Sequence, residues 1–163
     1  RSGIPIKPET RGQFMKVKDW DGLSITRFPI GYGVGVSPVQ MLRAYCALAD
    51  GGNLRKLRLI DRIEDPETGE IMQLPIEEPV KLYRNPAVAN QIVDMMAAVT
   101  GPDGTAFRAA VPGYKVAGKT GTSRKWISEE KAYSYRKSYA TFAGFVPVHN
   151  PAFVLVVVVD ESI

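Results

Sequence analysis

The stretch that decides the fold is Lys119-Thr120-Gly121-Thr122-Ser123, in the last third of the chain. We predict that it lies on a β-strand, where Lys119 and Gly121 point to one face and Thr120 and Thr122 to the other. A glycine inside a strand often marks a place where another backbone or a ligand comes very close. A lysine charge beside threonine hydroxyls suits an anionic substrate. Taken alone, the motif favours an ordinary surface strand whose lysine and threonines have no special role.

Two more strands are expected after this one. The predicted strands run from Tyr114 to Ser123, from Tyr139 to Pro147 and from Ala152 to Asp160. The third is almost entirely valine, and a continuous apolar run predicts a strand that is buried on both faces. Such a strand needs covering helices on both sides of the sheet and a neighbouring strand on both edges. Without them it presents an aggregation-prone edge.

Two helices are expected before the strands. Ser37-Pro38 supplies a capping hydroxyl followed by proline at the first helical position, and Gly51-Gly52 ends that helix. Asn85-Pro86 starts a second helix in the same way, and Gly101-Pro102 ends it. A short helical turn is expected from Ala106 to Ala110. These boundaries place both helices upstream of the Lys-Thr-Gly stretch.

The length of residues 1–163 corresponds to one domain or a large piece of one, and we expect three regions in it. Residues 1–30 show no sustained period and are expected to be an irregular lead-in with short extended pieces. Residues 31–112 are mainly helical and include a small hairpin, in which Leu57 to Glu64 and Glu70 to Leu74 flank a turn. The last region, 113–163, carries the Lys-Thr-Gly strand and the two strands that follow it.

Composition limits the classes of function. The 163 residues are 45% hydrophobic and 23% charged, which favours a folded core over disorder. The net charge of +4 comes without a lysine or arginine block, so we expect no nucleic-acid partner. Cys46 and His149 are the only residues of their types, which argues against a zinc site or a Cys-His dyad. We therefore predict neither a metal nor a cofactor.

One competing motif overlaps the Lys-Thr-Gly stretch. Gly113 to Thr120 matches the phosphate-loop pattern G-x-x-x-x-G-K-[ST], and Val156 to Val159 followed by Asp160-Glu161 resembles an acidic strand end that holds magnesium. A phosphate loop must follow a buried strand and open a helix. The residues before Gly113 form a poor strand, and Gly121 is a poor residue for a first helical turn. A nucleotide hydrolase is therefore a remote alternative.

Lys119-Thr120-Gly121-Thr122 resembles the third motif of penicillin-binding proteins. The resemblance to class B members of that family continues, in order, through roughly residues 28–162. It rests on Gly31-Tyr32-Gly33, Val36 to Gln40, Ala49 to Gly52, Gly104 to Ala106, Gly113 to Ser123, Phe142 to Pro147 and Asn150 to Asp160. The resemblance implies an α/β (α+β) fold of the serine-transpeptidase and β-lactamase type. In that fold an antiparallel sheet is flanked by helices, and we expect it to be incomplete in this chain.

The resemblance also implies a peptidoglycan D,D-transpeptidase that cross-links stem peptides through a serine acyl-enzyme and is acylated by β-lactams. Lys119 would supply positive charge near the nucleophile. Thr120 and Thr122 would bind the terminal carboxylate of the D-Ala-D-Ala peptide or of the drug. The backbone N–H of Thr122 would form half of an oxyanion hole. Gly121 would leave room for the helix that carries the serine.

The sequence departs from the family at its nucleophile. The family's S-x-x-K serine and S-x-N motif lie upstream of these segments, and neither occurs ahead of Gly31. Two S-x-x-K strings, Ser128 to Lys131 and Ser134 to Lys137, follow the Lys-Thr-Gly strand, and we treat both as chance matches. We therefore expect this polypeptide to be inactive alone and to need the N-terminal part of its domain. A non-catalytic module that binds a peptidoglycan peptide or a partner protein is the main alternative.

Two expectations about the intact protein follow from the resemblance alone. The intact protein would be anchored in the cytoplasmic membrane, with this domain on the outer, periplasmic side. Its partners would be the peptidoglycan stem peptide, β-lactam antibiotics and, as candidates, proteins of cell-wall synthesis or division. The longest purely apolar run, Phe153 to Val159, is far shorter than the ~20 residues that a membrane span needs.

Overall fold

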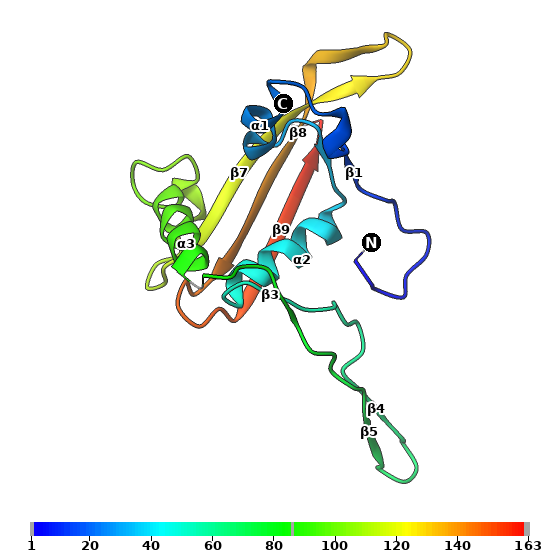
Figure 1. Ribbon diagram of the computed structural model, residues 1–163. Helices are drawn as coiled ribbons and strands as arrows, with labels where there is room; N and C mark the ends of the chain where they lie inside the picture. Colours follow the sequence, from blue (N-terminus) through cyan, green and yellow to red (C-terminus); the bar gives the residue numbers. More distant parts are fainter. Residues whose placement is uncertain (1, 86, 162–163) are drawn as a thin grey trace.

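A three-stranded antiparallel sheet forms the centre of the computed structural model, which describes residues 2–85 and 87–161 (Figure 1). Its strands are β7 (Ala117–Ile127), β8 (Ala132–Val146) and β9 (Phe153–Asp160), in the order β7-β8-β9. A turn at residues 128–131 joins β7 to β8, and residues 147–152 join β8 to β9. The expected antiparallel sheet of three consecutive strands is confirmed.

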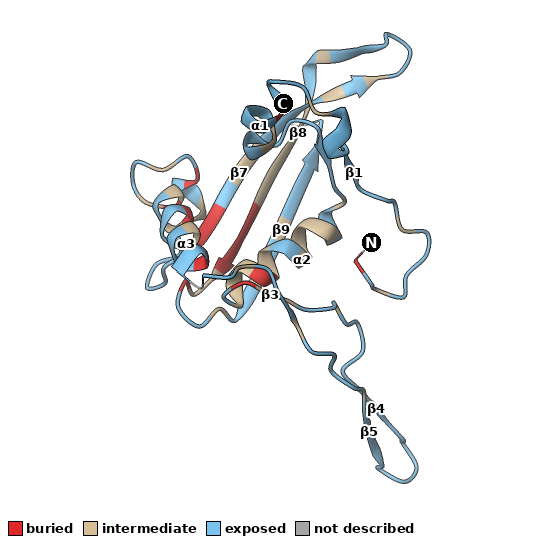
Figure 2. Cartoon of the chain, viewed as in Figure 1, coloured by how far each residue is buried: buried red, intermediate tan, exposed pale blue. Residues whose placement is uncertain are grey.

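Two helices pack on one face of this sheet. The helix α2 (Pro38–Ala49) contacts β8 and β9, and α3 (Ala87–Val99) contacts β7. Phe145 of β8 is 2% exposed and pairs with a β7 residue on one side and a β9 residue on the other. The core around it comprises Met96, Ala117 and Val148, with Tyr45, Leu48, Ile92, Val93 and Val154 packed against it. Figure 2 shows that the buried residues gather where the helices lie against β7 and β8.

The cap predicted for α2 is present. The Ser37 hydroxyl accepts a hydrogen bond from the Gln40 backbone N–H at 3.2 Å, and the Gln40 side-chain oxygen accepts one from the Ser37 N–H at 3.0 Å. This reciprocal pair satisfies donors that a helix start leaves without partners. At α3 the Asn85 side-chain oxygen accepts a hydrogen bond from the Ala87 N–H at 3.0 Å. Pro86, the other half of that predicted start, lies outside the described residues.

Ser37→Ala is expected to lower the free energy of unfolding by about 1 kcal/mol, because it removes the capping acceptor. Chemical denaturation of the wild-type chain and of the variant measures the difference. Ser128→Ala is the matched control, since Ser128 lies in an exposed turn and caps no helix. A loss of stability that is the same in both variants would show that the cap contributes nothing specific.

Short elements complete the fold, and several of them were not predicted. Three small antiparallel pairs are formed by β1 (Gln13–Phe14) with β2 (Val34–Gly35), β3 (Asn53–Leu54) with β6 (Val80–Lys81), and β4 (Arg62–Glu64) with β5 (Ile71–Gln73). The last pair confirms the expected hairpin, with shorter strands. The lead-in holds the helical turns η1 (Val17–Asp19), α1 (Ser24–Arg27) and η2 (Phe28–Ile30), and η3 (Phe107–Ala109) confirms the predicted turn. Elements of two to four residues are too short to show a period in sequence.

The predicted ends of the first two strands were wrong. The strand expected from Tyr114 begins at Ala117, because Tyr114 is held in a turn by its N–H bond to the Val111 carbonyl oxygen at 3.0 Å. It then continues past Ser123 to Ile127. The second strand begins at Ala132, upstream of its predicted start. Pairing within the β7–β8 hairpin extends both strands beyond the part of the sheet that the helices cover.

The prediction that the valine-rich strand is buried on both faces was also wrong. Phe153 is 72% exposed, Leu155 56% and Val159 49%. Within the described residues β9 is an edge strand, and α2 covers only the face that carries Val154 and Val156. Among the described residues nothing covers its other face, and no strand pairs with its outer edge. Such an edge is a template for unwanted pairing.

Candidate functional site

The Lys-Thr-Gly residues lie near the start of β7, directly after its buried first residues. Ala117 and Gly118 are buried, whereas Lys119 and Thr122 are exposed. Pairing with β8 is unbroken from Ala117 to Arg124, so side chains alternate between the two faces as predicted. Across the hairpin, Lys119, Thr120, Gly121 and Thr122 pair with Ala143, Phe142, Thr141 and Ala140.

Polar groups gather along this part of β7. The Lys119 ammonium donates to the backbone oxygen of Thr120 at 2.8 Å, and no ion pair holds it within the described residues. The Thr120 hydroxyl lies 3.1 Å from the hydroxyl of Thr105. Thr105 follows α3 and is fifteen residues away in sequence, so no spacing rule marked it as part of the site. An exposed ammonium and threonine hydroxyls on successive residues of one strand are groups that can bind a carboxylate.

Two glycines on β7 sit where a side chain would collide with β8. A Cβ at Gly121 would lie 2.6 Å from the hydroxyl oxygen of Thr141, which itself donates to the Gly121 carbonyl oxygen at 3.2 Å. A Cβ at Gly118 would lie 2.4 Å from the ring of Phe142. The predicted close approach at Gly121 is therefore made, within the described residues, by a side chain of the neighbouring strand.

The outer edge of β7 carries no paired strand in the part of the chain that the structure describes. The end of α3 is fixed beside the start of β7 by Thr100, whose hydroxyl donates to the Val116 carbonyl oxygen at 2.7 Å. After Val116, the backbone N–H and C=O groups of every second residue of β7 point away from β8. An extended peptide can pair with an edge of this kind.

The phosphate-loop alternative does not fit this geometry. Lys119 and Thr120 lie inside a strand that continues to Ile127. A phosphate loop would require a helix N-terminus directly after Thr120. The letter-for-letter match at Gly113 to Thr120 is therefore a chance match.

The two S-x-x-K strings do not form serine–lysine pairs. Ser128 lies in the exposed turn between β7 and β8. The Ser134 hydroxyl accepts hydrogen bonds from the backbone N–H groups of Arg136 and Lys137, at 3.1 Å and 2.9 Å. The Lys137 ammonium points instead to Glu161, 3.2 Å away. Among the hydrogen bonds of the described residues, neither serine hydroxyl is paired with a lysine ammonium, as a serine–lysine nucleophile would be.

An ion cluster ties the far ends of the three strands together. The Lys125 ammonium contacts both carboxylate oxygens of Asp160 at 2.9 Å and one oxygen of Glu161 at 3.0 Å. The hydrogen bonds that Lys125 donates to Asp160 and then to Glu161 raise the pKa of its ammonium. Hydrogen bonds from Lys125 and then Lys137 lower the pKa of Glu161. The cluster links β7 and β8 to the end of β9.

Acidification is expected to remove the contribution of Glu161 to stability. Because its pKa is lowered in the folded state, the stabilisation is present above the ordinary carboxyl pKa of about 4.3 and is lost as the pH falls through the folded value. Glu161→Gln should lower the melting temperature at pH 7 by on the order of 1 °C. Thermal melts should show no difference from wild type near pH 2. Glu129→Gln, in the exposed turn, is the control, and an undiminished difference at low pH would contradict this assignment.

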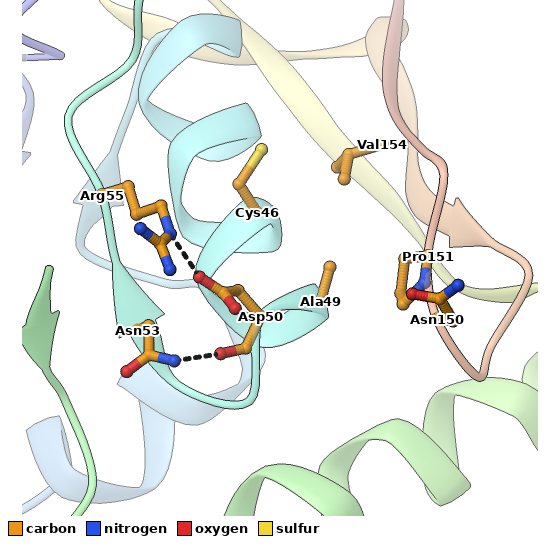
Figure 3. A pocket seen from close by; sticks show the side chains of 8 residues that line it. All are labelled: Cys46, Ala49, Asp50, Asn53, Arg55, Asn150, Pro151 and Val154. Carbon is orange, nitrogen blue, oxygen red and sulfur yellow. Dashed lines mark hydrogen bonds and ion pairs between the residues drawn. The ribbon is translucent and has the colours of Figure 1, made fainter. Parts of the chain in front are cut away.

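A pocket of about 380 Å³ lies elsewhere, between the end of α2, the loop after it and the start of β9 (Figure 3). It is lined by Cys46, Ala49, Asp50, Asn53, Arg55, Asn150, Pro151 and Val154. Asp50 and Arg55 form an ion pair at 2.6 Å and so compensate each other's charge. Burial raises the pKa of the Cys46 thiol, which makes it a poor nucleophile. This pocket contains no residue of β7, and its groups suggest no chemistry.

Other kinds of site are not evident in the described residues. Residues 2–85 and 87–161 contain no group of three or more His, Cys, Asp or Glu side chains that could hold a metal ion. Over the same residues, none of the helices combines the length and the hydrophobicity of a membrane span.

The helices on one face of an antiparallel sheet, and the Lys-Thr-Gly strand at its edge, define an α/β domain of the serine-transpeptidase and β-lactamase type. The profile described as "Penicillin binding protein transpeptidase domain" matches residues 3–162. The chain belongs to the penicillin-binding protein transpeptidase family.

Individual relatives agree with this family. The chain is 31% identical over 160 residues to the peptidoglycan D,D-transpeptidase FtsI of Escherichia coli, covering 98% of this chain and 25% of FtsI. It is 32% identical to the "Probable peptidoglycan D,D-transpeptidase PenA" of Neisseria gonorrhoeae, with the same coverage. The structure of penicillin-binding protein 3 from Mycobacterium tuberculosis, complexed with aztreonam, superposes with a TM-score of 0.89 at 29% identity. That match covers 99% of this chain and 37% of that one. The chain thus spans about a quarter of the length of these curated relatives.

Proposed function

We propose that this chain provides the Lys-Thr-Gly side of the active site in a class B peptidoglycan D,D-transpeptidase. The observation that carries the proposal is the strand β7, whose outer edge no strand of the described residues pairs with. The exposed Lys119 ammonium and the hydroxyls of Thr120 and Thr122 lie along this strand. The relatives named as D,D-transpeptidases support it. A peptide that ends in a free carboxylate is the ligand that fits such an edge.

The proposed reaction has two acyl-transfer steps. A serine hydroxyl attacks the carbonyl carbon of the penultimate D-alanine, the peptide bond to the terminal D-alanine breaks, and that residue leaves as the amine after taking up a proton. The amine of a neighbouring stem peptide then attacks the acyl-enzyme ester. A new peptide bond forms, and the serine hydroxyl is released with its proton. β-Lactams acylate the same serine because their ring amide replaces the scissile bond.

The residues of β7 have distinct parts in this scheme. Lys119 places a positive charge beside the reacting serine and the substrate carboxylate. The hydroxyls of Thr120 and Thr122 bind that carboxylate, and the backbone N–H of Thr122 donates to the developing oxyanion. Such donors are worth ~10²–10³ in rate because they are fixed before the charge forms. Gly121 keeps this part of the strand free of a side chain, so the serine-bearing helix can approach it.

The nucleophile comes from outside these residues in this proposal. No lysine ammonium is hydrogen-bonded to Ser128 or Ser134 in the described residues, which supports placing the S-x-x-K serine in another part of the same domain. The present chain alone is then inactive. The intact protein is anchored in the cytoplasmic membrane with this domain on its outer side. There it meets peptidoglycan, β-lactams and proteins of wall synthesis or division.

Release of D-alanine tests the proposed reaction. The full-length protein is incubated with a synthetic stem peptide that ends in D-Ala-D-Ala, and free D-alanine is measured over time. We expect release that depends on time and enzyme and is blocked by prior treatment with benzylpenicillin. Binding of the peptide without any D-alanine release would favour the non-catalytic module over the transpeptidase.

A further inference from the structure

The β7–β8 hairpin continues past the Lys-Thr-Gly residues (Figure 1). Its outer part carries exposed aromatic and basic side chains. Arg124, Trp126, Tyr133 and Tyr135 are called the hairpin platform below. Trp126 and Tyr133 are paired across the hairpin, with ring centroids 5.1 Å apart, edge to face. They are 50% and 60% exposed. Tyr135 is 90% exposed, and the guanidinium of Arg124 lies 4.9 Å from its ring centroid.

An irregularity in the pairing shapes this surface. The register shifts between Arg124 and Trp126, and residues 134–137 of β8 loop out opposite Lys125. The Ser134 hydroxyl fixes this bulge by accepting hydrogen bonds from two backbone N–H groups within it. Bulges re-aim side chains and are over-represented next to active sites. Here the bulge brings Tyr135 to the surface beside Arg124.

The chemistry of the platform differs from that of the uncovered face of β9. That face is purely aliphatic and aromatic, without polar groups, at Phe153, Leu155, Val157 and Val159. The platform instead combines large rings with an indole N–H, two phenol hydroxyls and a guanidinium, which suits a ligand that stays partly hydrated. Lys125 and Lys137 of this hairpin are paired with Asp160 and Glu161, so Arg124 is the cation that lies among the platform rings.

The distance from the Lys-Thr-Gly residues to the platform is similar to the length of a stem peptide. If the carboxylate end of a stem peptide lies at Lys119 to Thr122, its remainder must run toward Ser123, because Ala117 and Gly118 are buried. Trp126 lies four residues beyond Thr122, or about 13 Å along an extended strand. A stem peptide of about five residues spans at most ~17 Å. The sugar to which the peptide is attached would therefore lie over the outer part of the hairpin.

We propose that the hairpin platform binds the glycan chain of peptidoglycan. The rings of Trp126, Tyr133 and Tyr135 stack on the C–H faces of the pyranoses. Arg124 and the phenol hydroxyls hydrogen-bond to acetamido and lactyl oxygens. This inference rests on the proposed function, because it extends the same substrate from its peptide to its sugars.

Binding of glycan strands without peptide tests the platform directly. The probe is a preparation of peptidoglycan glycan strands whose stem peptides have been removed by amidase digestion, titrated into the full-length protein by isothermal calorimetry. Tyr135→Ser and Arg124→Gln should each weaken binding at least about fivefold, since each removes a ring or a cation from the contact. Both side chains are exposed, so folding should be unaffected. Tyr114→Ser, a 61% exposed tyrosine ahead of β7, is the control and should bind like wild type.

The outcomes separate this inference from the proposed function. The inference is overturned if both platform variants bind glycan as tightly as wild type does, or if wild type does not bind glycan. In either case a protein would be the better candidate ligand for the platform. Acylation by benzylpenicillin is measured on the same samples and should be unchanged by either substitution. A third outcome is that the wild-type protein binds glycan more tightly than the platform variants but is not acylated by benzylpenicillin. That result would support the platform and overturn the transpeptidase assignment.

Discussion

Lys119→Met should slow acylation of the full-length protein by benzylpenicillin at least ~100-fold. An effect of this size is expected when a preorganised charge is removed from an acyl-transfer site. The ammonium is exposed on β7 and bonded only to its neighbour's carbonyl oxygen among the contacts of the described residues, so it is available to substrate and nucleophile. Methionine keeps the length of the side chain and removes its charge. The rate of formation of the covalent adduct, followed by mass spectrometry, gives the fold-change.

Lys115→Met is the matched control for this substitution. Lys115 is exposed and lies just ahead of the strand, where its backbone oxygen accepts a bond from the Val148 N–H at 2.9 Å, a contact that the side-chain change keeps. Its acylation rate should equal that of wild type. If Lys119→Met and Lys115→Met acylate at the same rate, Lys119 is not part of the active site.

Gly144→Ala should destabilise the domain by about 1–3 kcal/mol and reduce β-lactam acylation with it. A Cβ at Gly144 would lie 2.5 Å from the carbonyl oxygen of Ala117 and 3.0 Å from the Cα of Gly118. Both are backbone atoms of β7, so no rotamer change relieves the collision. The two strands must separate directly beside Lys119, which displaces the Lys-Thr-Gly residues from their positions.

Gly22→Ala is the control, because a Cβ at Gly22 meets nothing within 4 Å and its backbone is not in the left-handed region. Urea denaturation gives the change in the free energy of unfolding for both variants. Gly144→Ala should unfold at clearly lower urea concentration, and Gly22→Ala within error of wild type. A Gly144→Ala variant as stable as wild type would mean that β7 and β8 are not packed as closely as described.

Features set by neighbouring residues were predictable from the sequence. The start of α2 at Ser37-Pro38 and its end before Gly51-Gly52 each depend on residues within about one turn of that helix end. The turn between β4 and β5 likewise depends on local bonds, such as that from the Gly69 N–H to the Asp65 carbonyl oxygen at 2.9 Å. The Lys-Thr-Gly strand was recognised for a different reason, namely its likeness to a family motif.

Features that depend on distant partners were not predictable. The Thr105–Thr120 contact joins a loop after α3 to a strand, and no periodicity encodes it. The extension of β7 to Ile127 depends on pairing with β8 across a bulge. The exposure of β9 was missed because a run of valines indicates only that burial is favourable, not that a covering layer is present.

Intact-mass spectrometry after incubation with benzylpenicillin tests the central claim most directly, namely that these residues form the Lys-Thr-Gly side of a site whose serine lies elsewhere in the domain. The polypeptide of residues 1–163 and the full-length protein are treated side by side. We predict that the full-length protein gains the mass of one drug molecule and that residues 1–163 alone gain none. An adduct on residues 1–163 would contradict this account, and peptide mapping would then decide between Ser128 and Ser134.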